Sequence, residues 1–382
     1  ATAIFQDANL SDFTSGVSSY DLARYTEVGL LSVDVQDSDY GNVGINIPAT
    51  PINIGRFIPD YFTQTIAEDG LFMAQCNAQT SFTAYSGQMD EATLTMGAIS
   101  YLTNPILAIT AYNKQGDITQ NYYQDSEGSA NDFMKLSASN ITINQPTTDE
   151  VAVGIDATKL PITANMSLGI LSQSDLTDSE NNVALPKGVL HYQLSDDDNF
   201  YYQRSANAKV SPFTSDIDFT IAAIVDADTV SASSTMTASP EGLEIRFGRL
   251  VLENSFGDET ANFPQVMHIQ HYDGDSFTPS SGYNCTSYNA DNITLSNISL
   301  DPNLTNVLGG TGSFVSGQTQ SIELEALELG VQGQMGVLYD AYYWLHFDWD
   351  NDGAFDDNPT AVASFGLYHG DDRMFHWREV FD

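Results

Sequence analysis

Apolar and polar residues alternate through most of this 382-residue chain, and this spacing constrains the fold more than any other feature. Leu190, Tyr192 and Leu194 occupy every second position, and a similar run through Ile221 and Ala223 begins at Phe219 and ends at Val225. Successive side chains of a strand point to opposite faces, so a period of two indicates half-buried strands. Clusters of Asn, Asp, Ser, Thr and Gly separate the runs at short intervals, as in β-sandwiches. We therefore predict an all-β fold of tandem β-sandwich (Ig-like) domains.

One predicted strand changes phase in its middle. Leu243, Ile245 and Phe247 share one face, but the apolar positions shift by one residue after Gly248. A shift by one residue moves side chains to the opposite face of a sheet. We therefore predict a β-bulge or a bend at this glycine.

The length of the chain allows two to four domains. Pro and Gly become frequent around residues 54–60, and a Ser/Thr-rich connection follows residue 230. We predict a partial β-sandwich unit over residues 1–57, a β-sandwich domain over 58–230, and a C-terminal β-sandwich domain with an acidic loop over 231–382.

The formal net charge is −39, from 51 acidic and 12 basic residues. Such a surface repels nucleic-acid phosphates and anionic membrane surfaces, so we predict neither as a partner. No stretch approaches the ~18 apolar residues of a membrane span, so we predict no membrane span in this chain. The acidity suits solubility in a salty or extracellular setting, and a specific cation-storage role is the alternative.

The chain contains two cysteines, Cys76 and Cys285. A zinc site would need clustered Cys and His residues, which this pair does not supply. In an exported protein the pair can form one long-range disulfide. We predict this disulfide, and two unpaired buried thiols are the alternative.

An acidic loop near the C-terminus has the spacing of a calcium-binding loop. Three Asp residues at alternate positions precede Gly353, and such carboxylates converge on one ion while the glycine permits a sharp turn. The twelfth position is Pro359 rather than a bidentate Glu, and a predicted strand over 342–347 precedes the loop. We predict a structural Ca²⁺ site, with a solvated acidic turn as the alternative. The candidate ligands are Asp348, Asp350, Asp352, the carbonyl of Ala354, and Asp356.

The sequence contains no recognisable catalytic motif. It has no G-x-S-x-G elbow, no H-E-x-x-H motif and no phosphate-binding loop, so we predict that the chain is not an enzyme and has no catalytic residues. Trp349 and Trp377 are candidate residues for stacking on carbohydrate. For Trp377 the alternative is a core position on a last strand.

Several segments in order along the chain resemble the MshQ-like family, whose proteins are associated with the mannose-sensitive haemagglutinin (MSHA) type IV pilus. The clearest is the string from Trp344 to Gly353, WLHFDWDNDG. The further matching segments are 25–29 (YTEVG), 54–60 (IGRFIPD), 246–254 (RFGRLVLEN), 363–373 (ASFGLYHGDDR) and 377–379 (WRE).

This resemblance implies an exported bacterial protein of β-sandwich units at the cell surface or on the pilus. It implies adhesion or a stalk or tip role, with pilus or cell-surface components and surface glycans as the expected partners. The family's domain has no assigned function, so no catalytic residue carries over. The alternatives are a carbohydrate-binding or carbohydrate-processing module and a structural filament subunit.

Overall fold

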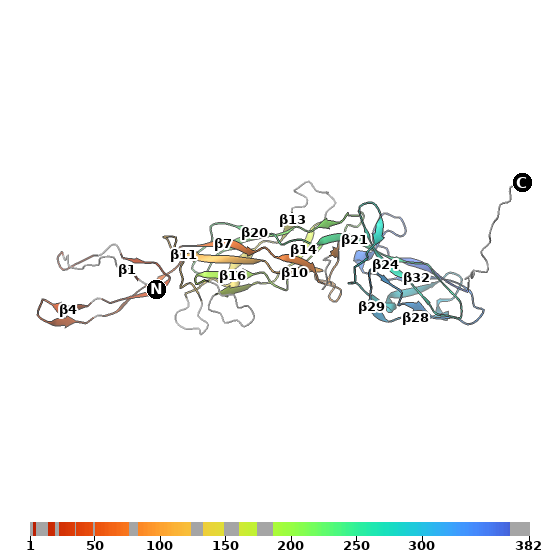
Figure 1. Ribbon diagram of the computed structural model, residues 1–382, viewed down its shortest axis with the longest axis horizontal. Helices are drawn as coiled ribbons and strands as arrows, with labels where there is room; N and C mark the ends of the chain where they lie inside the picture. Colours follow the sequence, from red (N-terminus) through yellow and green to blue (C-terminus); the bar gives the residue numbers. More distant parts are fainter. Residues whose placement is uncertain are drawn as a thin grey trace.

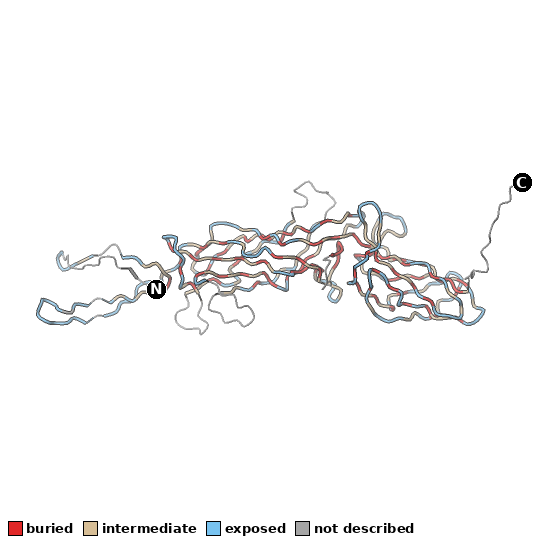
Figure 2. Tube along the Cα trace, in the orientation of Figure 1, coloured by how far each residue is buried: buried red, intermediate tan, exposed pale blue. Residues whose placement is uncertain are grey.

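The computed structural model shows an elongated chain with three parts in succession (Figure 1). A β-ribbon lies at the N-terminal end, a central unit follows, and a C-terminal unit completes the described chain. Buried residues concentrate inside the central and C-terminal units, whereas the ribbon is largely exposed (Figure 2). The structure describes residues 3–4, 14–19, 23–34, 36–48, 50–75, 83–123, 133–148, 160–173 and 186–366.

Strands make up the regular structure of these residues, and the predicted all-β fold of tandem β-sandwich domains is confirmed. The described ranges contain no α-helix. Their helical turns are short 3₁₀ segments, and none is long or apolar enough to cross a membrane.

The central unit contains three four-stranded sheets. The first sheet has the order β14 (Ile162–Asn165), β17 (Asn199–Tyr202), β10 (Ile99–Thr103) and β8 (Leu71–Ala74). The second has the order β15 (Ile170–Gln173), β16 (Val189–Gln193), β11 (Ile106–Tyr112) and β7 (Tyr61–Glu68). The third contains β12 (Ile141–Ile143), β19 (Ile217–Ile224), β13 (Thr147–Thr148) and β20 (Met236–Ala238).

The alternating sequence pattern builds the core of the central unit. On β16, Leu190 and Tyr192 are buried while their neighbours are half-buried, as the period of two predicts. Phe200 and Phe219 pack edge to face, with ring centroids 5.4 Å apart and an interplanar angle of 62°. Aromatic pairs in this geometry add to the hydrophobic stabilisation of a core.

The second predicted run keeps its period only in part. Phe219 and Ile221 are buried on β19, but the next buried residue is Ile224 rather than Ala223, and Val225 is exposed. The pairing with β12 skips one residue of β19 between Ile221 and Ala223. This β-bulge rotates the end of the strand, so the prediction for Ala223 and Val225 was wrong.

The C-terminal unit has its own buried core and several small sheets. Its main sheet has the order β22 (Ser255–Gly257), β33 (Thr360–Phe365), β32 (Gly333–Tyr339) and β27 (Ile293–Asn297). Smaller sheets contain β23 (Phe263–Pro264), β31 (Glu323–Leu324), β28 (Val307–Leu308), β26 (Ser287–Asn289) and β29 (Thr311–Ser313).

A further six-stranded sheet runs between the two units. Its strands are β9 (Thr83–Tyr85), β18 (Phe213–Thr214), β21 (Glu244–Leu252), β24 (Met267–Tyr272), β25 (Phe277–Pro279) and β30 (Gln318–Thr319).

The strand β21 belongs to both units. Its first three residues, 244–246, pair with β9, and its last six, 247–252, pair with β24. Phe247 and Gly248 are both buried, so the predicted change of phase at Gly248 is confirmed. The register with β24 continues through Gly248 without a shift, so the phase changes where the strand exchanges partners rather than at a bulge. Phe247 lies in the core of the central unit and Leu250 in that of the C-terminal unit.

The N-terminal ribbon is a long two-stranded extension of the central unit (Figure 1). Its base pairs β3 (Gly29–Val33) with β6 (Ile52–Phe57), and its tip pairs β4 (Asp37–Tyr40) with β5 (Ile45–Ile47). Next to it, β1 (Ala3–Ile4) pairs with β2 (Arg24–Tyr25).

Candidate functional site

The acidic loop lies in the C-terminal unit, between a 3₁₀ turn at Tyr343–Leu345 and the strand β33. The predicted strand over 342–347 is not formed, because a 3₁₀ turn occupies its middle. A single antiparallel bridge between Phe347 and Asp357 closes the loop instead. The two residues exchange both backbone hydrogen bonds, each 3.1 Å long. The bridge therefore holds the two ends of the loop together.

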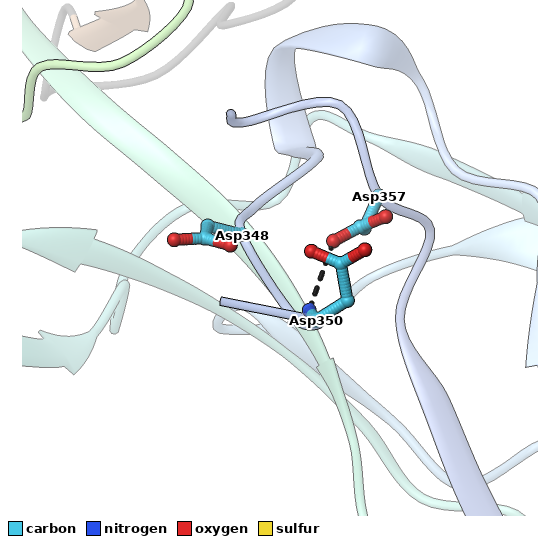
Figure 3. Close-up of side chains that lie close together, drawn as sticks. All are labelled: Asp348, Asp350 and Asp357. Atoms are coloured by element: carbon cyan, nitrogen blue, oxygen red, sulfur yellow. Dashed lines mark hydrogen bonds between the residues drawn. The ribbon is translucent and has the colours of Figure 1, made fainter. Parts of the chain in front are cut away.

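Three carboxylates converge at this closure. Asp348, Asp350 and Asp357 each offer an oxygen atom, and these atoms lie within 4.8 Å of one another. Figure 3 shows the three side chains, with the carboxyl groups of Asp350 and Asp357 next to each other. Three carboxylates at this spacing can hold a hard cation such as Ca²⁺.

The predicted ligand set and this cluster overlap only in part. Asp352 and Asp356 are exposed and do not belong to the cluster. Asp352 instead accepts the backbone N–H of Ala354 at 2.8 Å, which turns the chain at the tip of the loop. The sequence reasoning missed Asp357 because it counted positions along a calcium-loop template. The backbone pairing of Asp357 with Phe347 is what places Asp357 at the closure of the loop. The sequence alone does not distinguish Asp357 from the adjacent Asp356 in this respect.

Backbone groups support the cluster from one side. Asp357 Oδ2 accepts the backbone N–H groups of Trp349 and Asp350 at 2.8 and 3.0 Å. Asp348 Oδ1 is shielded from solvent and has no hydrogen-bond partner among the described residues. The backbone N–H of Asp352 lowers the pKa of Asp350, but desolvation and the negative charges around it raise that pKa overall. No ion pair among the described residues involves these three carboxylates.

Trp349, one of the two candidate carbohydrate-stacking residues, is half-buried beside this loop. Its ring meets the ring of Phe347 edge-on, with centroids 5.4 Å apart, and the Arg249 guanidinium lies 5.2 Å from its centroid. The same guanidinium lies 3.8 Å from the ring centroid of Phe277. Arg249 and Phe347 therefore already engage part of the Trp349 ring. The other candidate, Trp377, lies outside the described residues.

The predicted disulfide falls partly outside the description. Cys76 is not among the described residues, whereas Cys285 is half-buried in the C-terminal unit. Cys285 lines a cavity of about 270 Å³ together with Gln75 and Glu91. Gln75 directly precedes Cys76 in the sequence.

Two buried tyrosines, one from each unit, form hydrogen bonds and a ring contact across the junction. The Tyr85 hydroxyl, at the end of β9, donates to Ser280 Oγ at 2.7 Å. The Gln88 amide donates to the Tyr283 hydroxyl, also at 2.7 Å. The rings of Tyr85 and Tyr283 meet edge-on, with centroids 4.8 Å apart. Burial raises the pKa of both phenols, so both remain neutral; the Tyr85 hydroxyl donates across the junction, and the Tyr283 hydroxyl accepts.

An arginine of the central unit reaches into the C-terminal unit. Arg204 Nη2 donates to the carbonyl oxygens of Gly248 and His346 at 2.8 and 2.7 Å. Its guanidinium stacks 3.8 Å from the ring centroid of Phe247. Burial lowers the pKa of Arg204 to about 9, so the group stays charged at neutral pH. These contacts tie β21 to the segment that leads into the acidic loop.

A carboxylate completes the junction on another side. Glu91, in the central unit, accepts the backbone N–H of Ser287 at 3.0 Å and the Ser287 hydroxyl at 2.7 Å. Burial raises the pKa of Glu91. The hydroxyl of Tyr343 donates to the Gly87 carbonyl nearby. No local pattern in the sequence pointed to Glu91, Arg204 or Tyr85, because their partners lie far away along the chain.

Two family models match the chain, one over each unit. The model described as DUF6701, third domain, matches residues 27–246, and the model described as DUF6701, fourth domain, matches residues 246–380. The border between the two matches falls within β21. No curated protein gives a significant match.

Solved structures resemble the chain only weakly. Domains 5–6 of the S-layer protein SbsC are 6% identical with a TM-score of 0.17, covering 79% of this chain and 98% of that one. The Yersinia pseudotuberculosis adhesin InvE is 8% identical with a TM-score of 0.18, covering 80% of this chain and 60% of that one. The I67–I69 fragment of titin is 9% identical with a TM-score of 0.18, covering 84% and 91%. Similarity at this level carries no argument about function.

Proposed function

The chain belongs to the DUF6701 family, and from this premise we propose that it is a non-catalytic structural module of a bacterial cell surface. The observation that supports this proposal best is the shared strand β21, which pairs with β9 in one unit and β24 in the next. Bending the chain at this point would break backbone hydrogen bonds and expose the buried contacts of Arg204. A junction of this kind suits a rod that holds the structures at its two ends at a fixed distance.

The finer proposal is an extracellular adhesion, stalk or tip module associated with an MSHA-type pilus. The ordered segments shared with the MshQ-like family support it, and the net charge of −39 suits an environment rich in salt and divalent cations. Deleting the gene in the bacterium that carries it is expected to reduce pilus-dependent attachment. Normal attachment by the deletion strain would contradict the proposal. Specific binding on a glycan array would instead favour a carbohydrate-binding module, and filaments in electron micrographs a filament subunit.

We further propose that Ca²⁺ stiffens the C-terminal unit by binding at the loop closure. The convergence of Asp348, Asp350 and Asp357 supports this role. A cation there would neutralise their mutual repulsion and pin the loop to the bridge between Phe347 and Asp357. Because the unfolded chain does not hold the carboxylates together, binding would add about 1.4 kcal/mol of stability at a calcium concentration ten times the Kd.

The calcium proposal is tested by thermal unfolding in millimolar Ca²⁺ and in EDTA. Calcium is expected to raise the Tm of the natural chain and to leave that of Asp357→Asn unchanged. The matched control is Asp356→Asn, which removes a neighbouring carboxylate outside the cluster and is expected to keep the calcium effect. An unchanged Tm of the natural chain in EDTA would contradict the site. A calcium effect that is lost in Asp356→Asn but kept in Asp357→Asn would return the ligand set to the one the sequence predicts.

A disulfide between Cys76 and Cys285 remains part of the proposal. The shared cavity of Cys285 and Gln75 supports it. Such a bond would link the segment that follows β8 in the central unit to the C-terminal unit, and Glu91, which bonds to Ser287, lines the same cavity as Cys285. It would add a covalent tie to a junction that is otherwise held by hydrogen bonds and packing.

A further inference from the structure

The base of the N-terminal ribbon has one apolar face that the described chain covers only in part. Leu31 lies opposite Ile54, and Val33 lies opposite Ile52, in the antiparallel pairing of β3 with β6. Directly opposed residues share a face of a ribbon, so these four side chains form one apolar surface. Ile52 is 64% exposed and Ile54 is 44% exposed.

The other face of the same segment is polar. Ser32 lies opposite Asn53, and both residues are exposed. The ribbon is therefore amphipathic at these paired positions, although Leu30, next to Leu31 in β3, is also apolar and exposed. In a ribbon that is solvated on both faces, nothing favours apolar residues on one face over the other. One apolar and one polar face are typical of a strand pair that packs on one side.

The apolar face also forms a hollow. Leu31, Val33 and Ile54 line a concave space of about 210 Å³ together with Phe57 and the segment 23–25, which closes its inner end. The rings of Tyr25 and Phe57 pack against each other at the inner end, with centroids 4.9 Å apart. The hollow is thus preformed and lined mainly by carbon, which suits an inserted apolar side chain.

The base of the ribbon is anchored firmly to the central unit. Arg56, at the end of β6, forms an ion pair with Asp228. The Asn113 side chain donates to the carbonyl oxygen of Thr26 at 2.9 Å, and Val28 is 1% exposed. The direction of the ribbon is therefore set by the sandwich. An isolated two-stranded ribbon is only marginally stable in water, so a surface that covers its apolar face would stabilise it.

We propose that this face is the docking surface for the second domain of the DUF6701 family. The family models number the matched domains third and fourth, and the third begins at residue 27, immediately before the ribbon. In a polypeptide that carries the second domain, that domain joins this unit at the ribbon end. The ribbon points away from the central unit on this side (Figure 1). The ribbon can therefore hold the second domain in a fixed position relative to the third, as β21 does for the fourth domain.

Charge disfavours a second copy of this chain as the occupant. Asp34, Asp37 and Asp39 lie along the ribbon, and the chain carries a net charge of −39. Two such ribbons placed face to face would bring like charges together. The docking proposal goes beyond the proposed surface role and does not depend on calcium or on a pilus.

The test compares hydrogen–deuterium exchange in the 382-residue chain with exchange in a polypeptide that also carries the second domain. Backbone amides of β3 and β6 are expected to exchange at least tenfold more slowly in the longer polypeptide. In the longer polypeptide, the double substitution Ile52→Ser with Ile54→Ser is expected to restore fast exchange of β3 and β6, while the core strands β11 and β16 stay protected. The matched control, Asn53→Ser on the polar face, is expected to keep the protection.

Two outcomes would overturn the proposal. Equal exchange of β3 and β6 in the two natural polypeptides would show that the second domain does not cover this face. Sedimentation of the 382-residue chain as a dimer that the double isoleucine variant dissociates would identify a second copy as the occupant. The first exchange comparison uses two polypeptides without substitutions. Its result therefore remains valid even if a substitution in the ribbon alters the structure of the ribbon.

Discussion

Replacing Gly248 by alanine is expected to destabilise the C-terminal unit through one methyl group. A Cβ atom at this position would lie 2.6 Å from Tyr85 Cδ1 and 3.0 Å from Leu345 Cδ2. Carbon atoms in ordinary contact are about 3.5–4.0 Å apart, so the Tyr85 ring would have to move by roughly 1 Å. Its hydroxyl is bonded to Ser280 and its ring packs on Tyr283, and these contacts oppose that movement.

The magnitude follows from the cost of overpacking a buried site. Inserting one carbon into a well-packed core typically costs about 1–3 kcal/mol. For a unit of this size the cost corresponds to a fall in Tm of roughly 3–9 °C. Differential scanning calorimetry measures the shift, and the transition that contains the C-terminal unit is expected to move, because Tyr85 packs in that core.

Gly336→Ala provides the matched control. Gly336 also lies within a strand, β32, but a Cβ there would meet only the Ser296 hydroxyl, a small exposed side chain that can rotate away. The control is expected to leave the Tm unchanged or slightly raised, because alanine restricts the unfolded chain more than glycine does. A Gly248→Ala protein that is as stable as Gly336→Ala would refute the reasoning that the two units are packed together at this glycine.

Three further results are expected. First, burial raises the pKa of Asp198 from 3.8 to about 6, so the folded chain favours the neutral acid and loses this stabilisation as the pH rises through about 6. Asp198→Asn is therefore expected to flatten the pH dependence of the unfolding free energy between about pH 4 and pH 7. An unchanged slope would contradict this expectation. Second, Arg204→Met keeps a side chain over Phe247 but leaves the Gly248 and His346 carbonyls without their donor, so urea unfolding is expected to show a loss of about 2–4 kcal/mol; a loss under 1 kcal/mol would mean that Arg204 does not hold the junction. Third, reducing the proposed disulfide is expected to lower stability by at most about 5 kcal/mol, and detection of two free thiols in the natural, non-reduced chain by mass spectrometry would rule the bond out.

The fold class could be predicted from local patterns alone. A period of two reports that a segment has one buried and one solvated face, and it places Leu190 and Tyr192 in the core. The change of phase at Gly248 was visible for the same reason, because the apolar residues on either side of it face different cores. The acidic loop was visible as a composition, and two of its three alternating Asp residues, Asp348 and Asp350, do belong to the carboxylate cluster.

The tertiary structure decided which groups meet. The bridge between Phe347 and Asp357 selects Asp357 over its neighbour Asp356 for the carboxylate cluster, and this register depends on how the loop closes rather than on spacing. The bulge that buries Ile224 in place of Val225 depends likewise on the partner strand β12.

The junction shows the same division between sequence and structure. Alternation predicts a strand through Gly248, but only the paired strands show that its two halves join two different units. Arg204 and Glu91 carry no local signal, because their hydrogen-bond partners lie 44 to 251 residues away. Local sequence therefore determined the fold class and the buried face of strands such as β16, where no bulge interrupts the alternation. Long-range pairing determined how the units are joined, because it depends on contacts between residues that sequence spacing does not relate.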